Sequence, residues 1–137
     1  MKTLTPRTDV VLAGLALVDV LGRPVDIHHP PRRGGLQLMD SMTLTTGGNV
    51  ANCGIDLAKL GFRVGAISRV GTDPLGDFVL RHLAQFRIDT SGVTVDRRAQ
   101  TSATFVAVEK GGERTFFHTR GCLRNFRITD ILKFLPL

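Results

Sequence analysis

The chain has 137 residues, of which 42% are hydrophobic and 22% are charged, and its formal net charge is +6. These values are typical of a single globular domain and argue against a disordered segment. The basic side chains are scattered and no aromatic residues alternate with them, which argues against a nucleic-acid surface. The apolar run over residues 10–18 is too short to span a membrane and lacks a leader-type cleavage site.

The cysteines and histidines carry no recognisable metal or redox motif. Cys53 and Cys122 do not form a CxxC pair, so neither a zinc site nor a redox pair is predicted. The pair His28-His29 has no third ligand nearby in the sequence, and we interpret it as part of an exposed loop. We expect a soluble, cytoplasmic protein with reduced thiols and no bound metal.

The first predicted element is a buried strand over residues 10–16, which form a short continuous apolar run. Asp19 lies just beyond the end of this strand. Ligands of open α/β sheets gather at the carboxyl ends of strands, so Asp19 is either a site residue or the cap of a turn. Residues 20–35 are rich in Pro, Gly and His and predict a loop, whereas the even spacing from Leu36 to Leu44 predicts a half-exposed strand.

Two helices and two strands are predicted in the middle of the chain. Apolar residues recur at helical spacing from Val50 to Leu60, and residues 63–70 form a second apolar strand. Asp73 is a good N-cap and Pro74 a good first residue for the next helix. A short strand is predicted over residues 93–95. Gly54 would lie inside the first helix, where close packing on a sheet would explain it.

The last third of the chain predicts a hairpin and the start of a helix. Residues 101–109 and 114–118 are rich in Thr, Val and Phe and flank a Gly-Gly turn. Thr129-Asp130 resembles a helix start. The alternation of strands and helices predicts a parallel sheet with right-handed crossovers, and the two interrupting β segments are expected to pair as a separate small sheet.

The segment Gly47-Gly48-Asn49-Val50-Ala51-Asn52 has the chemistry of a hydroxyl-binding turn. Glycine lets the backbone approach a ligand, and the helix N-terminus adds free N–H donors. Asn49 and Asn52 are one turn apart, so their amides can face the same space, and Asp19 could accept from two hydroxyls. Without further information an ordinary strand-to-helix turn explains the pattern equally well. The spacing is neither Walker A nor GxGxxG.

Several blocks in the same order resemble the ribokinase-like (PfkB-type) carbohydrate kinases. The resemblance runs from about Val10 to Gly121 and rests on five blocks beside Asp19. These are Gly47 to Asn52, then Leu57-Ala58-Lys59-Leu60-Gly61, then Val70-Gly71-Thr72-Asp73 with Gly76, and the two lid-like segments Thr101 to Phe105 and Arg114 to His118.

The resemblance implies the N-terminal part of an α/β doubly wound sandwich with a small β-sheet lid. It predicts one incomplete domain over residues 1–137. Its lid segments would cover about 20–46 and 99–118, and its core elements about 8–19, 47–98 and 119–137. The family uses ATP and Mg²⁺ to phosphorylate a sugar hydroxyl, and neither of these two sites is complete in this chain.

By resemblance, Asp19, Gly48 and Asn52 would bind sugar hydroxyls, with Asn49 beside them, and Gly47 would shape the turn. Phe105 would either close an apolar side of the pocket or pack within the lid. No motif in the lid loops selects one sugar.

The catalytic half of the family pattern has no counterpart in this sequence. The family's late Gly-Ala-Gly-Asp-type motif supplies the base and the anion hole, and it is absent. The Gly76-Asp77 pair belongs to the early signature and is rejected as a substitute. Cys122-Leu123 also replaces the small-plus-amide pair that relatives often carry. We therefore expect no catalytic residue here, and an isolated chain without kinase activity.

Two function classes remain open at this stage. The first is the sugar-binding and lid portion of a carbohydrate kinase. The second is a non-catalytic module, truncated or frameshifted, that binds a sugar or pairs with another copy through its lid strands. The expected partners are a sugar-like small molecule and a second lid, with no nucleic acid and no membrane.

Overall fold

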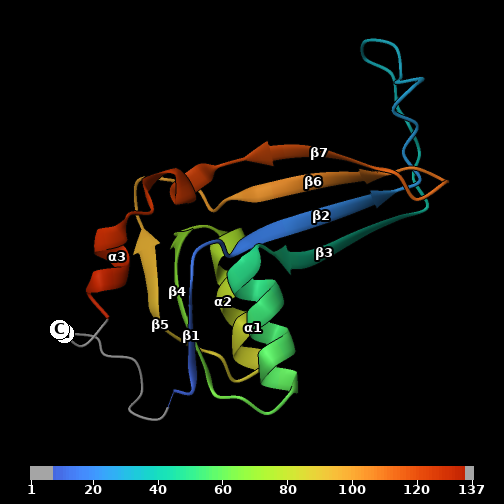
Figure 1. Ribbon diagram of the computed structural model, residues 1–137. Helices are drawn as coiled ribbons and strands as arrows, with labels where there is room; N and C mark the ends of the chain where they lie inside the picture. The colour runs from blue at the N-terminus through green and yellow to red at the C-terminus, as the bar shows by residue number, and fades with distance from the viewer. Residues whose placement is uncertain (1–7, 135–137) are drawn as a thin grey trace.

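The computed structural model describes residues 8–134, which form two sheets and the helices packed on one of them (Figure 1). In chain order the elements are β1 (Val10–Ala13), β2 (Leu17–Arg23), β3 (Ser41–Gly47), α1 (Asn49–Lys59), β4 (Val64–Gly71), α2 (Pro74–Gln85), β5 (Asp89–Asp96), β6 (Ala103–Val108), β7 (Arg114–Thr119), the 3-10 helix η1 (Gly121–Asn125) and α3 (Ile128–Leu132).

The three-stranded sheet is parallel, in the order β1-β4-β5. Helices α1 and α2 lie on one side of it, and α3 lies beyond β5 on the other (Figure 1). Buried aliphatic side chains of the strands and of both helices form one core, which includes Val50, Val70, Val79 and Leu83. The predicted parallel sheet with crossover helices is thereby confirmed.

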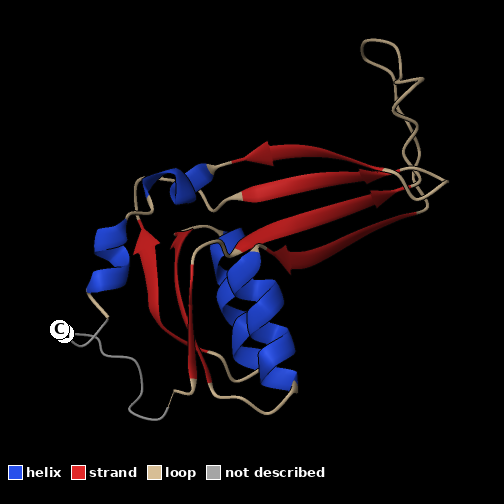
Figure 2. Ribbon diagram, in the orientation of Figure 1, coloured by secondary structure: helices blue, strands red, loops and turns tan. Residues whose placement is uncertain are grey.

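The four-stranded sheet has the order β3-β2-β6-β7, in which β2 and β6 run parallel and the outer pairs antiparallel. It extends over the upper ends of α1 and α2, and the loop between β2 and β3 projects from its far end (Figure 2). We call it the lid sheet. The predicted hairpin is confirmed. The two β segments share one sheet as predicted, but they do not pair directly, because β2 lies between β3 and the hairpin and includes residues 20–23, which were predicted as loop. No helix within residues 8–134 is long and apolar enough to cross a membrane.

The first predicted strand is wrong in its extent, because residues 10–16 belong to β1 and to a bend. Gly14 has a φ of +143°, and the chain leaves the first sheet there. The hydroxyl of Ser68 donates to Gly14 O at 2.7 Å and accepts from Ala16 N at 3.2 Å. These contacts hold the bend, and β2 then begins at Leu17 in the lid sheet.

The bounds of two other strands also differ from those predicted from the sequence. The alternation from Leu36 predicted a strand, but β3 begins only at Ser41, and Leu36 and Leu38 lie in the exposed loop before it. The third parallel strand is longer than residues 93–95 and covers Asp89–Asp96. Helix α2 begins as predicted, with the Asp73 carboxylate accepting from Gly76 N at 2.9 Å.

Gly54 is buried in α1 where the helix faces the sheet. A methyl group there would meet Ile88 Cδ1 at 3.4 Å and Leu12 Cδ1 at 3.5 Å, which are ordinary contacts with flexible side-chain ends. Gly54→Ala should therefore raise the free energy of unfolding by about 0.5–1 kcal/mol, because alanine has the higher helix propensity. Urea denaturation followed by circular dichroism measures this change, and a lower stability would show that the helix–sheet contact has no room for a methyl group.

Candidate functional site

The turn between β3 and α1 requires glycine at Gly48 and has little room for a side chain at Gly47. Gly48 has a φ of +88° and a ψ of 160°, a conformation that is essentially reserved for glycine, and a Cβ there would collide with Leu15 O. A Cβ at Gly47 would collide with the carboxylate of Asp19, whose Cγ lies 2.7 Å from that position. The two glycines therefore bring the turn directly against β2.

Asp19 lies in β2 and not after the end of a strand, so its predicted placement was wrong. Its side chain is half-buried on the face of the lid sheet that Gly47 shares. No hydrogen bond or ion pair to its carboxylate occurs among residues 8–134. A half-buried carboxylate without a protein partner can accept from two hydroxyl groups of a ligand.

A row of polar residues crosses the lid sheet through Asp19. Asp19 is in register with Thr45 of β3 and with Thr104 of β6, and Thr104 is in register with His118 of β7. Residues in register across neighbouring strands share a face. The hydroxyl of Thr104 lies 3.1 Å from His118 Nδ1. Thr104 and His118 lie in the two lid-like segments, but no sequence motif points to them, since only the strand register reveals that they share a face with Asp19.

Asn49 is held by the bend between β1 and β2. Its Oδ1 accepts from Leu15 N at 2.8 Å, and its Nδ2 donates to Ala13 O at 3.4 Å. The main chain of the same bend also uses one donor of the helix N-terminus, because Val50 N donates to Leu15 O at 2.9 Å. Asn49 therefore positions the turn, and one of the N–H groups that we expected to be free is already satisfied.

Asn52 faces a different surface from Asn49. It is exposed and lines a cavity of about 320 Å³ below the lid, where Thr46 Oγ1 lies 2.9 Å from His82 Nδ1. Asp56 and Lys59 line the same cavity. The expectation that the two amides face one space is not met.

Phe105 lies on the opposite face of the lid sheet from Asp19. It is in register with Val20, one residue further along β2, so its side chain points the other way. Its ring packs 6.3 Å from that of Phe117, and both Met39 and Phe105 crowd the space beside Gly22. Of the two interpretations that the sequence left open, packing within the lid describes its contacts.

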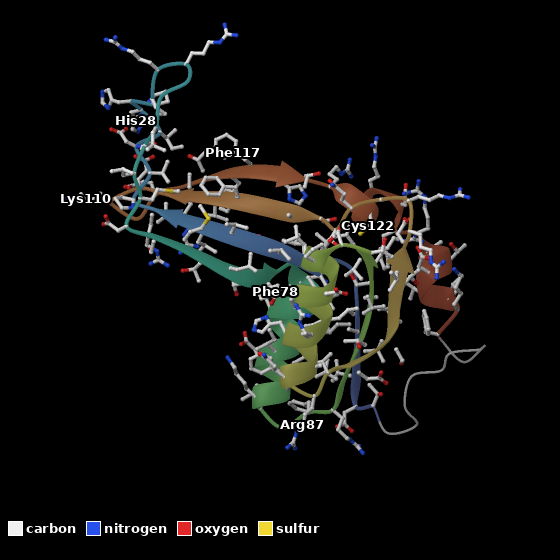
Figure 3. The ribbon with its side chains drawn as sticks, turned by 180° about the vertical axis from the view of Figure 1, so that it is seen from behind. His28, Phe78, Arg87, Lys110, Phe117 and Cys122 are labelled. Carbon is white, nitrogen blue, oxygen red and sulfur yellow. The ribbon has the colours of Figure 1, made fainter. Side chains whose placement is uncertain are left out.

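Cys122 is fully buried where the lid meets the three-stranded sheet (Figure 3). Its thiol donates to Arg69 O at 3.2 Å. Burial raises the pKa of Cys122, which keeps the thiol protonated and unreactive. No group of three or more His, Cys, Asp or Glu side chains in the described part of the chain could hold a metal ion.

Comparison with known proteins gives one consistent result. The model of a family described as pfkB family carbohydrate kinase matches residues 7–133. A fructokinase from Klebsiella pneumoniae is 41% identical over 70 residues, which cover 51% of this chain and 23% of that protein. The chain spans about a quarter of the length of the curated relatives it matches.

Solved structures agree with the sequence comparison. A PfkB protein from Polaromonas sp. JS666 superposes with a TM-score of 0.74 at 27% identity, covering 90% of this chain and 39% of that one. A ribokinase from Thermotoga maritima superposes with a TM-score of 0.67 at 23% identity, covering 82% and 36% respectively, which shows a shared fold. The expected ribokinase-like α/β fold is confirmed.

Proposed function

Because this chain belongs to the pfkB family of carbohydrate kinases, we propose that it is the sugar-binding and lid portion of an enzyme that transfers phosphate from ATP to a sugar hydroxyl. The observation that carries this proposal is the unpartnered, half-buried carboxylate of Asp19 against the Gly47-Gly48 turn. A carboxylate beside exposed backbone is suited to hold hydroxyl groups in a fixed orientation.

Each residue of this turn has a distinct part in the proposal. Asp19 accepts from sugar hydroxyls, and Gly47 and Gly48 let the backbone approach them. Asn49 holds the bend that carries β2, and its contact with the substrate stays a prediction. Asn52 contacts the sugar only if the ligand reaches around the start of α1. Phe105 is left out because it lies on the other face of the lid sheet.

ATP and Mg²⁺ belong to the proposal for the whole enzyme. ATP would supply the phosphoryl group, and Mg²⁺ would neutralise its charge. The residues described here do not fit the metal, since residues 8–134 offer no cluster of ligands for it. What these residues contribute is binding and orientation of the acceptor.

We expect the isolated chain to release no ADP from ATP in the presence of sugars, because nothing in its sequence matches the motif that supplies the base. A coupled assay of purified protein over ribose, fructose, 2-keto-3-deoxygluconate, inositol and nucleosides measures this rate. Steady, sugar-dependent ADP release that disappears in Asp19→Ala would contradict the expected inactivity.

The same compounds in a thermal-shift screen test the binding function. We expect at least one of them to raise the melting temperature of the wild-type chain but not that of Asp19→Asn. Equal shifts in both proteins would place the sugar elsewhere.

The alternative function is a non-catalytic module that pairs through its lid. Exposed apolar side chains on the lid sheet favour it, since Phe116 and Phe117 are 61% and 57% exposed and Met42 is 60% exposed. Sedimentation analysis would distinguish the two, because a stable dimer that binds none of the sugars would support the module.

A further inference from the structure

The polar row through Asp19 ends at a basic cavity that the proposed function does not use. Thr119, Arg120, Gly121 and Arg124 line this open cavity of about 530 Å³ together with His118, and Ala99 and Gln100 complete it. His118 belongs to both features, because its ring contacts Thr104 of the row. The cavity therefore continues the face of the lid sheet that carries Asp19.

The cavity has unbalanced positive charge. Arg120 and Arg124 are both exposed, and neither guanidinium has an ion pair or hydrogen-bond partner among residues 8–134. No Asp or Glu lines the cavity. By contrast, the guanidiniums of Arg63 and Arg69 are each paired with carboxylates. Two neighbouring unpaired guanidiniums on a concave surface are suited to bind a carboxylate or phosphate group.

The spacing between the two features matches a small acidic sugar. β2 and β7 are separated by β6 alone, so Asp19 and His118 are two strand spacings apart, about 10 Å. A six-carbon chain with an anionic end group bridges this distance when a long Arg side chain reaches toward it. Asp19 and the basic cavity then bind opposite ends of one ligand.

We propose that the sugar recognised by this chain carries an anionic group, a carboxylate or a phosphate, which Arg120 and Arg124 bind while Asp19 holds the hydroxyls. This inference rests on the proposed function and names the substrate class of that site. A bound carboxylate would neutralise one of the two arginines and a doubly charged phosphate both, whereas a neutral sugar would leave both positive charges uncompensated.

Calorimetric titration of the full chain with three matched ligands tests the proposal: a neutral hexose, the corresponding sugar acid and the corresponding sugar phosphate. We expect one or both anionic ligands to bind about tenfold or more tightly than the neutral sugar, as one charge-assisted contact would give. Whichever anion binds more tightly identifies the group as carboxylate or phosphate. The affinity of the anionic ligands should fall as the salt concentration rises, whereas the affinity of the neutral sugar should not.

The variant Arg120→Gln with Arg124→Gln should remove this preference and leave the affinity for the neutral sugar unchanged. Arg81→Gln is the matched control, since it removes an exposed charge from α2, outside the cavity, and it should bind like the wild type. If the control also lost its preference for the anionic ligands, that preference would come from the net charge of the chain and not from this cavity, which would overturn the proposal.

Three further outcomes separate this inference from the proposed function on which it rests. Equal binding of neutral and anionic sugars, abolished by Asp19→Asn, would overturn the anionic class and leave the sugar site intact. Inorganic phosphate that binds as tightly as the anionic sugars and is indifferent to Asp19→Asn would show an adventitious anion site only. No binding of any of the three sugars would overturn both proposals.

Discussion

Gly48→Ala is expected to lower the free energy of unfolding by about 3 kcal/mol or more, because two costs coincide at this position. The backbone has a φ of +88° and a ψ of 160°, which a side chain rarely permits. The added methyl group would also collide with the carbonyl of Leu15 in the bend that precedes β2. Urea denaturation followed by circular dichroism measures the loss.

Gly61→Ala is the control for this variant. Gly61 also has a positive φ, +93°, but nothing lies within 4 Å of where its Cβ would be. Gly61→Ala should lower the free energy of unfolding by about 1 kcal/mol, which is the cost of the backbone conformation alone. If the two variants were equally stable, the close packing of the turn against Leu15 would be refuted.

The second large effect is expected at Arg69, which joins two carboxylates at the junction of β4, β5 and α3. Its guanidinium donates to Asp96 Oδ2 at 3.0 Å and to Asp130 Oδ1 at 3.0 Å, and the Asp130 side chain is only 3% exposed. Arg69→Met keeps the apolar stem but removes the guanidinium that both carboxylates share, and the buried charge of Asp130 then keeps only its main-chain contact and Lys133. The loss should be about 3 kcal/mol.

Arg63→Met is the matched control for Arg69→Met. Arg63 pairs with Asp9 at the surface, where both side chains are largely hydrated, and its replacement should lose far less stability. If both variants lost similar amounts of unfolding free energy, the Arg69 network would stabilise the fold no more than a surface ion pair does.

The Arg69 network also predicts a dependence on pH. Burial raises the pKa of Asp130, but the main-chain N–H of Arg127 and the guanidinium of Arg69 outweigh it and hold that pKa below its usual value. The pKa of Asp96 is lowered chiefly by the N–H of Arg98, with a contribution from Arg69. Stability from such groups is present above the ordinary Asp pKa of about 3.9 and is lost as the pH falls through the lowered values. The difference between wild type and Arg69→Met should therefore shrink below about pH 4.

Local signals in the sequence were enough to predict most elements. Asp73 and Pro74 marked the start of α2 because capping depends only on neighbouring residues. The Gly-Gly turn marked the hairpin of β6 and β7 for the same reason. The break at Gly14 was missed, since it depends on Ser68, which is distant in the sequence.

The composition of the site was harder to predict than its location. The sequence identified Asp19 and the glycine turn, and the structure brings them together. It could not show which face of a strand each side chain occupies, because a shift of one residue in register reverses every face. That is why two interpretations of Phe105 stayed open, and why Thr104 and His118 were not noticed. Asn49 and Asn52 are one helical turn apart, yet contacts with the bend direct one of them away.

The most direct test of the sugar-site proposal is a map of the binding surface. Amide NMR spectra of the labelled chain, recorded with and without the tightest ligand of the thermal-shift screen, would locate the bound sugar. We expect the largest shift changes at Asp19, Gly47 and Gly48 and on the adjoining strand at Thr104, and we expect Asp19→Asn to abolish them. Saturable shifts confined to other surfaces, unchanged in Asp19→Asn, would contradict the assignment of this turn as the sugar site.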